Sequence, residues 1–203
     1  MTRVVLASAN PGKLREFAAL LAPFAVELVP QAELGIRPAV ETGTTFLENA
    51  LIKSHHAARH AHLPAIADDS GLEVEALGGR PGVWSARFAG EAASDEDNLR
   101  HLLAELHDVP DEFRQARYQC VIVFLRAASD QAPLIAHGTW EGRIARMPRG
   151  RGGFGYDPVF IPAGEQRTAA ELSGAAKNAV SHRGQALRAL VAMLESEGYI
   201  RTP

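Results

Sequence analysis

Cysteine is nearly absent from this chain. Its 203 residues include one cysteine, Cys120, so an internal disulfide framework and a cysteine-cluster metal site are both excluded. The surrounding sequence, Tyr-Gln-Cys-Val-Ile-Val-Phe, is mostly apolar. This setting predicts a buried and unreactive thiol.

Long apolar runs and an excess of basic charge are also missing. No apolar run approaches the ~18 residues of a membrane span, and the first residues lead into a strand pattern rather than a signal-peptide layout. We therefore expect a cytoplasmic protein that does not bind membranes. The formal net charge is −3, which provides no overall positive field for direct binding of nucleic acid.

The composition is that of a soluble globular protein. Apolar residues make up 46% of the chain and charged residues 22%, both ordinary values. The length allows one sizeable core, in one body or two lobes. Apolar patterns predict strands over residues 3–8, 24–29, 117–127 and 133–146 and a further strand that leads into the acids at 68 and 69, with helices after residues 10, 45, 94 and 184.

The most informative stretch is residues 66–73, where an apolar run ends in two adjacent acids. Asp68 and Asp69 follow the run directly, and Ser70 and Gly71 come next. This order indicates a buried strand with carboxylates at its end, pointing to opposite faces. Two adjacent carboxylates repel, and a divalent cation relieves that repulsion. A surface turn built on Asp-Ser-Gly is the alternative, and these residues leave both open.

A strand followed by a helix start comes near the N-terminus. Asn10 suits the N-cap of a helix and Pro11 its first position. The free N–H groups of such a terminus attract phosphate, and Lys13 adds a positive charge. The alternative is a plain strand–helix connection with a solvated lysine. The spacing G-x-x-x-x-G-K-[ST] of a Walker A loop is absent.

Glu41 lies just before a second helix, which starts with the capping-box pattern Thr45-Phe46-Leu47-Glu48. An acid that only stabilises the helix dipole is the alternative to a functional role for Glu41. We expect Lys53 to be exposed one and a half turns into the helix. Four histidines gather near the end of this helix: His55, His56, His60 and His62. They do not indicate a zinc site, because cysteine partners and an H-E-x-x-H pattern are both missing.

A glycine-rich loop spans residues 150–162. Phe154 and Tyr156 place aromatic rings beside flexible backbone, and Asp157 follows at once. Rings next to exposed amides suit stacking and edge recognition of a flat base; a glycine-rich turn with core aromatics is the alternative. A second loop rich in glycine, residues 78–87, is a candidate pocket wall.

Basic side chains gather before the last helix. Lys177, His182 and Arg183 precede its apolar stripe, and unpaired cations are disfavoured at a helix N-terminus. An anionic or carbonyl-bearing ligand would explain them. A salt bridge to Glu171 or Asp157 would explain them equally.

Five segments, in this order along the chain, resemble the inosine/xanthosine triphosphate pyrophosphatases. Each segment is weak alone, but together they extend from position 8 to position 184. They are Ser-Ala-Asn-Pro-Gly-Lys at 8–13, Glu-Thr-Gly-Thr-Thr-Phe-Leu-Glu-Asn-Ala at 41–50, Ala-Asp-Asp-Ser-Gly-Leu at 67–72, Gly-Phe-Gly-Tyr-Asp-Pro at 153–158 and Ser-His-Arg-Gly at 181–184.

The resemblance implies an α/β fold, with a mixed twisted β-sheet, flanking helices and an elongated two-lobed single domain over residues 1–203 with a central cleft. It also implies a homodimer, a nucleotide substrate and a required Mg²⁺. The reaction of that family is hydrolysis of non-standard purine triphosphates (dITP, ITP, XTP) to the monophosphate and pyrophosphate, which keeps such bases out of DNA and RNA.

Carried over by position, Asp69 would act as the general base and would bind the metal together with Glu41, with Asp68 nearby. The residues that would hold the phosphates are Ser8, Ala9, Asn10, Pro11, Gly12, Lys13 and Lys53. The residues that would hold the sugar and base are Ser70, Phe154, Gly155, Tyr156, Asp157, Lys177, His182 and Arg183.

The expected chemistry agrees with the residue types. Metal coordination makes water nucleophilic at neutral pH, and donors from Lys177, Arg183 or loop amides would pair with the purine C6 carbonyl that adenine lacks. Exclusion of GTP needs recognition near C2, for which no residue is assigned. The alternatives are a pyrophosphatase for other bases, such as modified pyrimidines, a nucleotide-sensing protein without catalysis, and an α/β domain whose glycines and acids are only turns.

Overall fold

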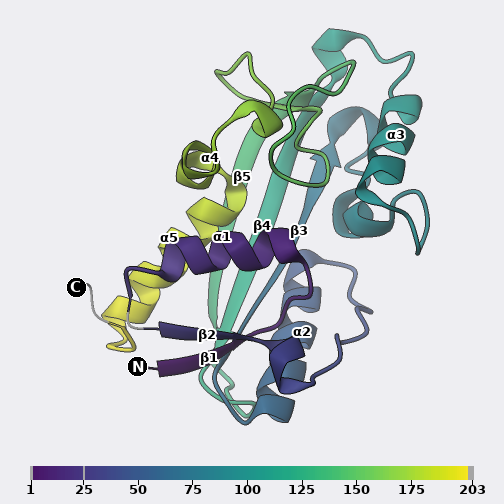
Figure 1. Cartoon of the computed structure of the whole chain (residues 1–203). Coiled ribbons are helices and arrows are strands. Elements are labelled where there is room, and N and C mark those ends of the chain that lie inside the picture. The colour runs from purple at the N-terminus through teal and green to yellow at the C-terminus, as the bar shows by residue number, and fades with distance from the viewer. Residues whose placement is uncertain (1, 25, 201–203) are drawn as a thin grey trace. The chain divides into compact units, whose positions relative to one another are not determined.

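A mixed sheet of six strands runs through the part of the chain that the computed structural model describes, residues 2–24 and 26–200. Its order is β2-β1-β3-β4-β5-β6. Strand β1 is parallel to β2 and β3, whereas β5 and β6 are antiparallel (Figure 1). The bounds are β1 Thr2–Leu6, β2 Val26–Pro30, β3 Ala65–Val74, β4 Gln115–Leu125, β5 Leu134–Ile144 and β6 Phe160–Pro162.

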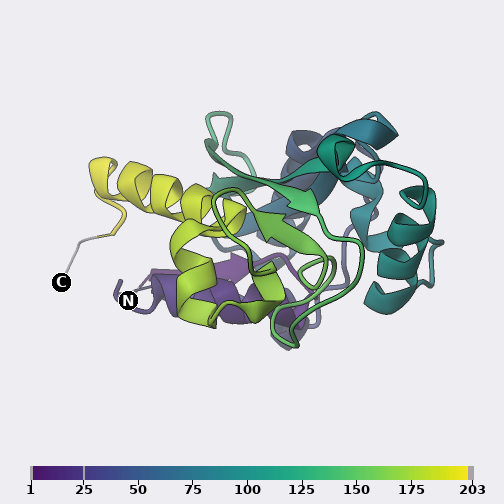
Figure 2. The same cartoon turned by 90° about the horizontal axis from the view of Figure 1, so that it is seen from above.

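Three helices begin at predicted residues, after Asn10, Thr45 and Ser94. The last helix begins at His182, so His182 and Arg183 lie within it rather than before it, and the helix over residues 174–180 was not predicted. Asn10 caps the first helix, and Thr45 forms a capping box with Glu48 at the second. Figure 2 shows the last helix, in yellow, leading to the C-terminal end of the described chain. The helices are α1 Pro11–Leu21, α2 Phe46–Ala61, α3 Asp95–Glu105, α4 Gly174–Val180 and α5 His182–Ser196, and short 3₁₀ turns lie at Gln31–Leu34, Glu75–Leu77, Gly82–Arg87, Asp111–Phe113 and Ala169–Glu171.

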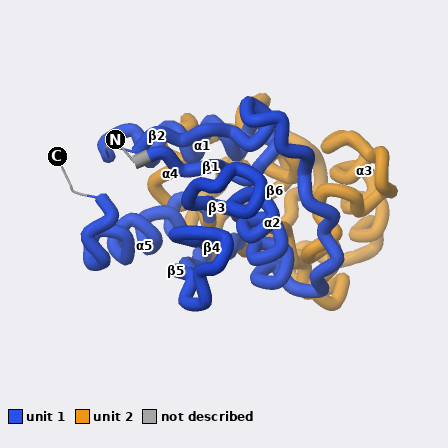
Figure 3. The backbone as a smooth tube through the Cα atoms, turned by 90° about the horizontal axis from the view of Figure 1, so that it is seen from below, with its two compact units in different colours: residues 1–69, 120–138, 183–203 blue, residues 70–119, 139–182 orange. Residues whose placement is uncertain are grey.

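The predicted α/β class with a mixed sheet and flanking helices is therefore confirmed. Within it the chain divides into two compact units (Figure 3). Unit 1 comprises residues 1–69, 120–138 and 183–203, and unit 2 comprises residues 70–119 and 139–182. Strands β3, β4 and β5 each pass from one unit into the other. The single domain over residues 1–203, its elongated shape and its central cleft stay predictions.

The sheet of unit 1 is covered by helices on both faces. Alternate strand residues pack with α1 and α5 or with α2, as the pleat requires. We call these the α1/α5 face and the α2 face. On β4, the even positions Cys120, Ile122 and Phe124 belong to the α1/α5 face, and the odd positions Val121, Val123 and Leu125 belong to the α2 face.

Unit 2 has a core of its own. Leu99 and Leu102 on α3 and Leu106 at its C-terminal cap contribute to it, as their spacing predicted, and they pack with aromatic side chains that include Tyr118 and Trp140. None of the described helices combines the length and apolarity that a membrane span requires.

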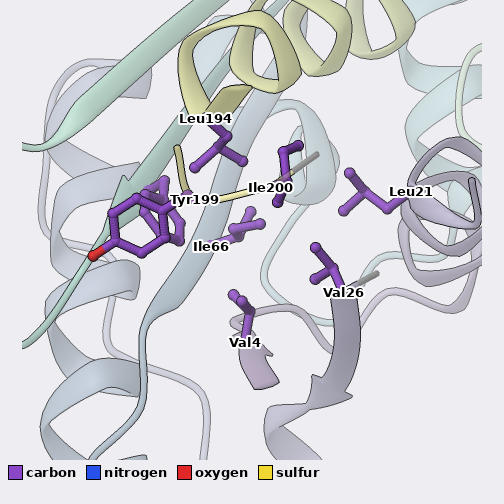
Figure 4. Close-up of a pocket in the computed structure, with 8 residues that line it drawn as sticks. Val4, Leu21, Val26, Ile66, Leu194, Tyr199 and Ile200 are labelled. Carbon is purple, nitrogen blue, oxygen red and sulfur yellow. The ribbon is translucent and has the colours of Figure 1, made fainter. Parts of the chain in front are cut away.

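A small apolar cavity lies inside unit 1 (Figure 4). Strand, helix and C-terminal residues line it, and none of them carries a charge. It therefore does not suit a triphosphate, which needs cationic and hydrogen-bonding partners. The lining residues are Val4, Leu21, Val26, Ile66, Phe124, Leu194, Tyr199 and Ile200.

Candidate active site

Strand β3 carries both acids without ending at them. It continues from Ala65 to Val74, so Ser70 and Gly71 are strand residues. The surface turn considered above is therefore wrong, and so is the expectation that the strand ends at the acids. Asp68 and Asp69 are both buried.

Asp68 pairs with cations from the two helices of the α1/α5 face. Its Oδ2 lies 2.9 Å from Lys13 Nζ on α1 and 3.2 Å from Arg183 Nε on α5. Arg183 also pairs with Glu16 of α1. Burial alone would raise the pKa of Asp68, but Lys13 and Arg183, with Lys53 behind them, outweigh it and hold that pKa well below its usual range. Asp68 is therefore an anion at any ordinary pH.

Asp69 faces α2. Its Oδ1 accepts a hydrogen bond from Lys53 Nζ at 2.8 Å, and its Oδ2 accepts one from Asn49 Nδ2 at 3.2 Å. Burial raises the pKa of Asp69, and the nearby charge of Glu41 adds to the rise, although Lys53 opposes it. A carboxylate with a raised pKa accepts a proton more readily than an ordinary one.

Lys53 joins the two candidate metal ligands. Its Nζ lies 3.3 Å from Glu41 Oε1 as well as 2.8 Å from Asp69 Oδ1. Only 12% of its side chain is exposed, so the expectation of an exposed lysine is wrong: the loop that carries Glu41 brings an anion onto the helix surface. Burial lowers the pKa of Lys53, but Asp69, Asp68 and Glu41 raise it above the ordinary value.

The loop before α1 is held by its own polar side chains. Asn10 Oδ1 accepts hydrogen bonds from the N–H groups of Gly12 at 2.8 Å and Lys13 at 3.2 Å. Ser8 Oγ accepts one from Asn10 N–H at 3.2 Å, while Ala9 and Pro11 are exposed. Because Lys13 pairs with a buried acid, the alternative of a solvated lysine is wrong.

Glu41 and Asp69 fit a hard divalent cation. Each has a carboxylate oxygen within 3.3 Å of the same lysine nitrogen, so both can face one positive charge. Mg²⁺ is usually held by one or two carboxylates, with water and substrate phosphates as its other ligands. Among the described residues no group of three or more histidine, cysteine or acidic side chains could hold a metal.

In unit 2 the residues of the glycine-rich loop surround a buried ion pair. Lys177 Nζ lies 2.6 Å from Asp157 Oδ2, and the same oxygen accepts a hydrogen bond from Phe154 N–H at 2.9 Å. The Lys177 ammonium also lies 4.7 Å from the centre of the Phe154 ring. The salt bridge to Asp157 considered above is therefore present, while Glu171 caps a turn by accepting from Thr168 N–H at 2.7 Å.

Two further contacts hold this loop. Asp95, at the start of α3, accepts a hydrogen bond from Gly155 N–H at 2.8 Å. Tyr156 donates its hydroxyl to the Ser85 carbonyl at 2.8 Å, which connects the loop to the predicted wall at residues 78–87. The amides of Phe154 and Gly155 are thus already engaged, and they are poor candidates for donors to a base.

Most of the predicted site residues fall into two sets. Unit 1 holds those assigned to phosphates and metal, and unit 2 holds Ser70, His182 and the glycine-rich loop. Arg183, grouped above with the base, lies instead in unit 1 with Asp68 and Glu16. His182 stacks on Tyr118, with ring centroids 4.6 Å apart.

Several supporting residues were missed by the sequence reasoning. Asn49, Ser85, Asp95 and Tyr118 all contact predicted site residues. Asn49 could have been found from the sequence. It lies on the same helix face as Lys53, and an asparagine inside a helix is unfavourable unless its amide has a hydrogen-bond partner. No sequence signal distinguished the other three.

The sequence and fold match known proteins over nearly their whole length. The model of the Ham1 family matches residues 4–193. Proteins named dITP/XTP pyrophosphatase from Shigella flexneri and Escherichia coli (strain K12) are 56% and 55% identical over 196 residues, covering 97% of this chain and 100% of each relative.

Solved structures agree with these matches. A HAM1 protein from Coxiella burnetii superposes with a TM-score of 0.89 at 49% identity, covering 97% of this chain and 100% of that one. A nucleoside-triphosphatase / dITP/XTP pyrophosphatase from Mycobacterium abscessus gives a TM-score of 0.75 at 45% identity, covering 94% and 99%.

Proposed function

The chain belongs to the Ham1 family, and on that premise we propose that it hydrolyses dITP, ITP and XTP to the monophosphate and pyrophosphate. The names of its near relatives support this substrate class. The observation that carries the proposal is the setting of Asp69, a buried carboxylate held by Lys53 and Asn49, with Glu41 on the same lysine.

Asp69 is the proposed general base. Its raised pKa favours acceptance of a proton from water that attacks the α-phosphate. When held by Glu41 and Asp69, Mg²⁺ supplies a water of lowered pKa and neutralises phosphate charge. The reaction requires no covalent nucleophile, and we do not assign that role to Ser70.

Lys13, Lys53 and the start of α1 bind the triphosphate in this proposal. The raised pKa of Lys53 keeps its ammonium charged at neutral pH. Positive charge beside the leaving pyrophosphate stabilises the negative charge that grows there in the transition state. Asp68 holds Lys13 and Arg183 in place.

Unit 2 supplies base recognition in this proposal. Lys177, with Asp157 and the Phe154 ring around it, is a donor that suits the C6 carbonyl of hypoxanthine or xanthine. Adenine presents an amine at that position, so its pairing with an ammonium is lost.

We also propose that the protein works as a cytoplasmic homodimer with Mg²⁺ as its cofactor, as the family resemblance implies. Sedimentation at micromolar concentration tests the dimer directly. A single species with the mass of one chain, 21.8 kDa, contradicts it.

The first test is product analysis. Purified protein is given dITP, XTP, dATP or dGTP, each with Mg²⁺ or with EDTA. We expect pyrophosphate from dITP and XTP only when Mg²⁺ is present, with dATP and dGTP nearly untouched. Orthophosphate instead of pyrophosphate contradicts attack at the α-phosphate. Tight nucleotide binding with no release indicates a nucleotide sensor.

The role of Asp69 is tested by Asp69→Asn. Loss of a general base commonly costs ~10²–10⁴-fold in rate, so we expect kcat to fall by at least that range while nucleotide binding, measured by equilibrium dialysis, persists. The matched control is Asp130→Asn, the same change in unit 1 at an acid that pairs with Arg126, which should leave kcat unchanged. Full activity of the Asp69 variant rules out Asp69 as the base.

A further inference from the structure

We propose that Asn49 is a positioning residue that sets the orientation of the Asp69 carboxylate and joins it to the loop that carries Glu41. The inference rests on the function proposed above, because it concerns how those two acids are held for the reaction. The names of the relatives assign Asn49 no role, and its place on the helix face indicates only that its amide has a partner.

The first observation is that both ends of the Asn49 amide are engaged. Its side chain is 0% exposed. Its Oδ1 accepts a hydrogen bond from Gly43 N–H at 2.9 Å, and its Nδ2 donates to Asp69 Oδ2 at 3.2 Å. A backbone N–H can only donate, so the oxygen of the amide must face Gly43 and the NH₂ group must face the carboxylate. The amide therefore has one satisfied orientation.

The second observation is that two side chains of α2 bind the two oxygens of one carboxylate. Asn49 and Lys53 are four residues apart, so they lie on one face of the helix. Lys53 donates a hydrogen bond to Oδ1 of Asp69, and Asn49 donates one to Oδ2. Lys53 is long and is shared with Glu41, and a triphosphate would compete for its charge. Asn49 is short, neutral and buried, so its hydrogen bond to Asp69 does not depend on a charge for which a triphosphate would compete.

The third observation is the close approach of the Glu41 loop to Asn49. A Cβ built on Gly43 would lie 2.7 Å from Asn49 Oδ1 and 2.6 Å from Glu48 Cβ. A side chain is therefore not tolerated at Gly43 unless its neighbours move. Gly43 is two residues after Glu41, so the same amide that orients Asp69 also anchors the loop that brings Glu41 to Lys53.

A purely structural role makes a different prediction. If Asn49 only anchors the loop, any side chain that accepts from Gly43 N–H should serve. Asn49→Asp keeps that acceptor, removes the donor to Asp69 and places a second carboxylate against it. Asn49→Leu removes both hydrogen bonds. The pair of variants therefore separates anchoring from positioning.

The experiment measures kcat and KM with dITP, melting temperature, and Mg²⁺ affinity by calorimetry without nucleotide. Partners that orient a ligand typically contribute 10–100-fold to metal affinity or activity. We expect kcat to fall by about that factor in Asn49→Asp with KM changed little, and Mg²⁺ affinity to fall by about that factor in Asn49→Leu. Ser54→Ala is the control, since Ser54 is buried on the same helix and donates to Leu51 O.

A further variant keeps the test decisive if the Asn49 variants fold poorly. Gly43→Ala leaves every atom of Asn49 and Asp69 in place, but its new Cβ would displace the side-chain amide of Asn49. We expect a smaller fall in kcat in the same direction. Wild-type kcat in Asn49→Asp, or wild-type Mg²⁺ affinity in Asn49→Leu, overturns the inference. If the wild-type protein releases no pyrophosphate, the proposed function fails, whereas the comparison of Mg²⁺ affinity still decides the role of Asn49.

Discussion

Among single residues, Cys120 has a strongly altered ionisation outside the acidic site. It lies in β4 on the α1/α5 face and is buried. Burial raises the pKa of its thiol to about 12, and the charge of Asp68 adds to the rise. The thiolate is the reactive form of cysteine, so the folded protein should resist alkylation, as the apolar surroundings of Cys120 in the sequence predicted.

This pKa predicts a loss of stability at alkaline pH. The unfolded thiol ionises near pH 8.5, so between that pH and about 12 the folded state binds the extra proton, and the free energy of unfolding must fall as pH rises. Below the pKa of the unfolded thiol, ionisation of Cys120 does not lower the free energy of unfolding. We expect the free energy of unfolding, measured with urea, to fall between pH 8 and pH 10 by about 1–2 kcal/mol more in the wild type than in Cys120→Ala. Equal pH slopes for both proteins contradict the prediction.

Lys53 and Asn49 show the limit of prediction at this scale. Their helix and its capping box could be predicted, because capping depends on residues three apart in sequence. Their partner, Asp69, is 16 and 20 residues away, and Glu41 reaches Lys53 by a loop. Whether a lysine is exposed depends on such distant contacts. The spacing of apolar residues along a helix does not predict them.

At the scale of elements, the pleat of β3 decides which acid meets which helix. Even positions of unit 1 face α1 and α5 and odd positions face α2, so Asp68 meets Lys13 and Arg183 while Asp69 meets Asn49 and Lys53. Opposite faces for the two acids could be predicted from adjacency alone. The identity of the covering helices could not, because it depends on the three-dimensional course of the chain.

The pairing of β5 with β6 gives a prediction for one glycine. A Cβ at Gly142 would collide with the Ile161 carbonyl and approach Phe160 Cζ to 2.7 Å. We expect Gly142→Ala to lower the free energy of unfolding by about 1–3 kcal/mol, as overpacking does. Gly174→Ala is the control, since its Cβ would meet nothing within 4 Å at the start of α4. Equal melting temperatures for the two variants contradict this account.

At the scale of the whole molecule, the α/β class and the family could be predicted, and the comparisons confirm both. Five short segments sufficed for the family because their order is improbable by chance. The division into two units could not be read in the same way, because three strands cross it without any turn or linker in the sequence.

Unfolding can be followed separately in each unit. Both tryptophans, Trp84 and Trp140, belong to unit 2, and Cys120 belongs to unit 1. Tryptophan fluorescence and the rate of thiol labelling in urea therefore report different units. We expect coincident midpoints, since β3, β4 and β5 have continuous backbone through both units and coincident probes mark a two-state transition. Two separate midpoints would mean that the units unfold independently.

The alternation along β3 also restricts how this segment can change in length. Inserting or deleting one residue between Ala65 and Asp68 would exchange the faces of the two acids, presenting Asp68 to α2 and Asp69 to α1 and α5. A change of two residues would preserve the faces and shift only the position along the strand. Natural variation and segment grafting should therefore keep the parity of this stretch even where they alter its composition.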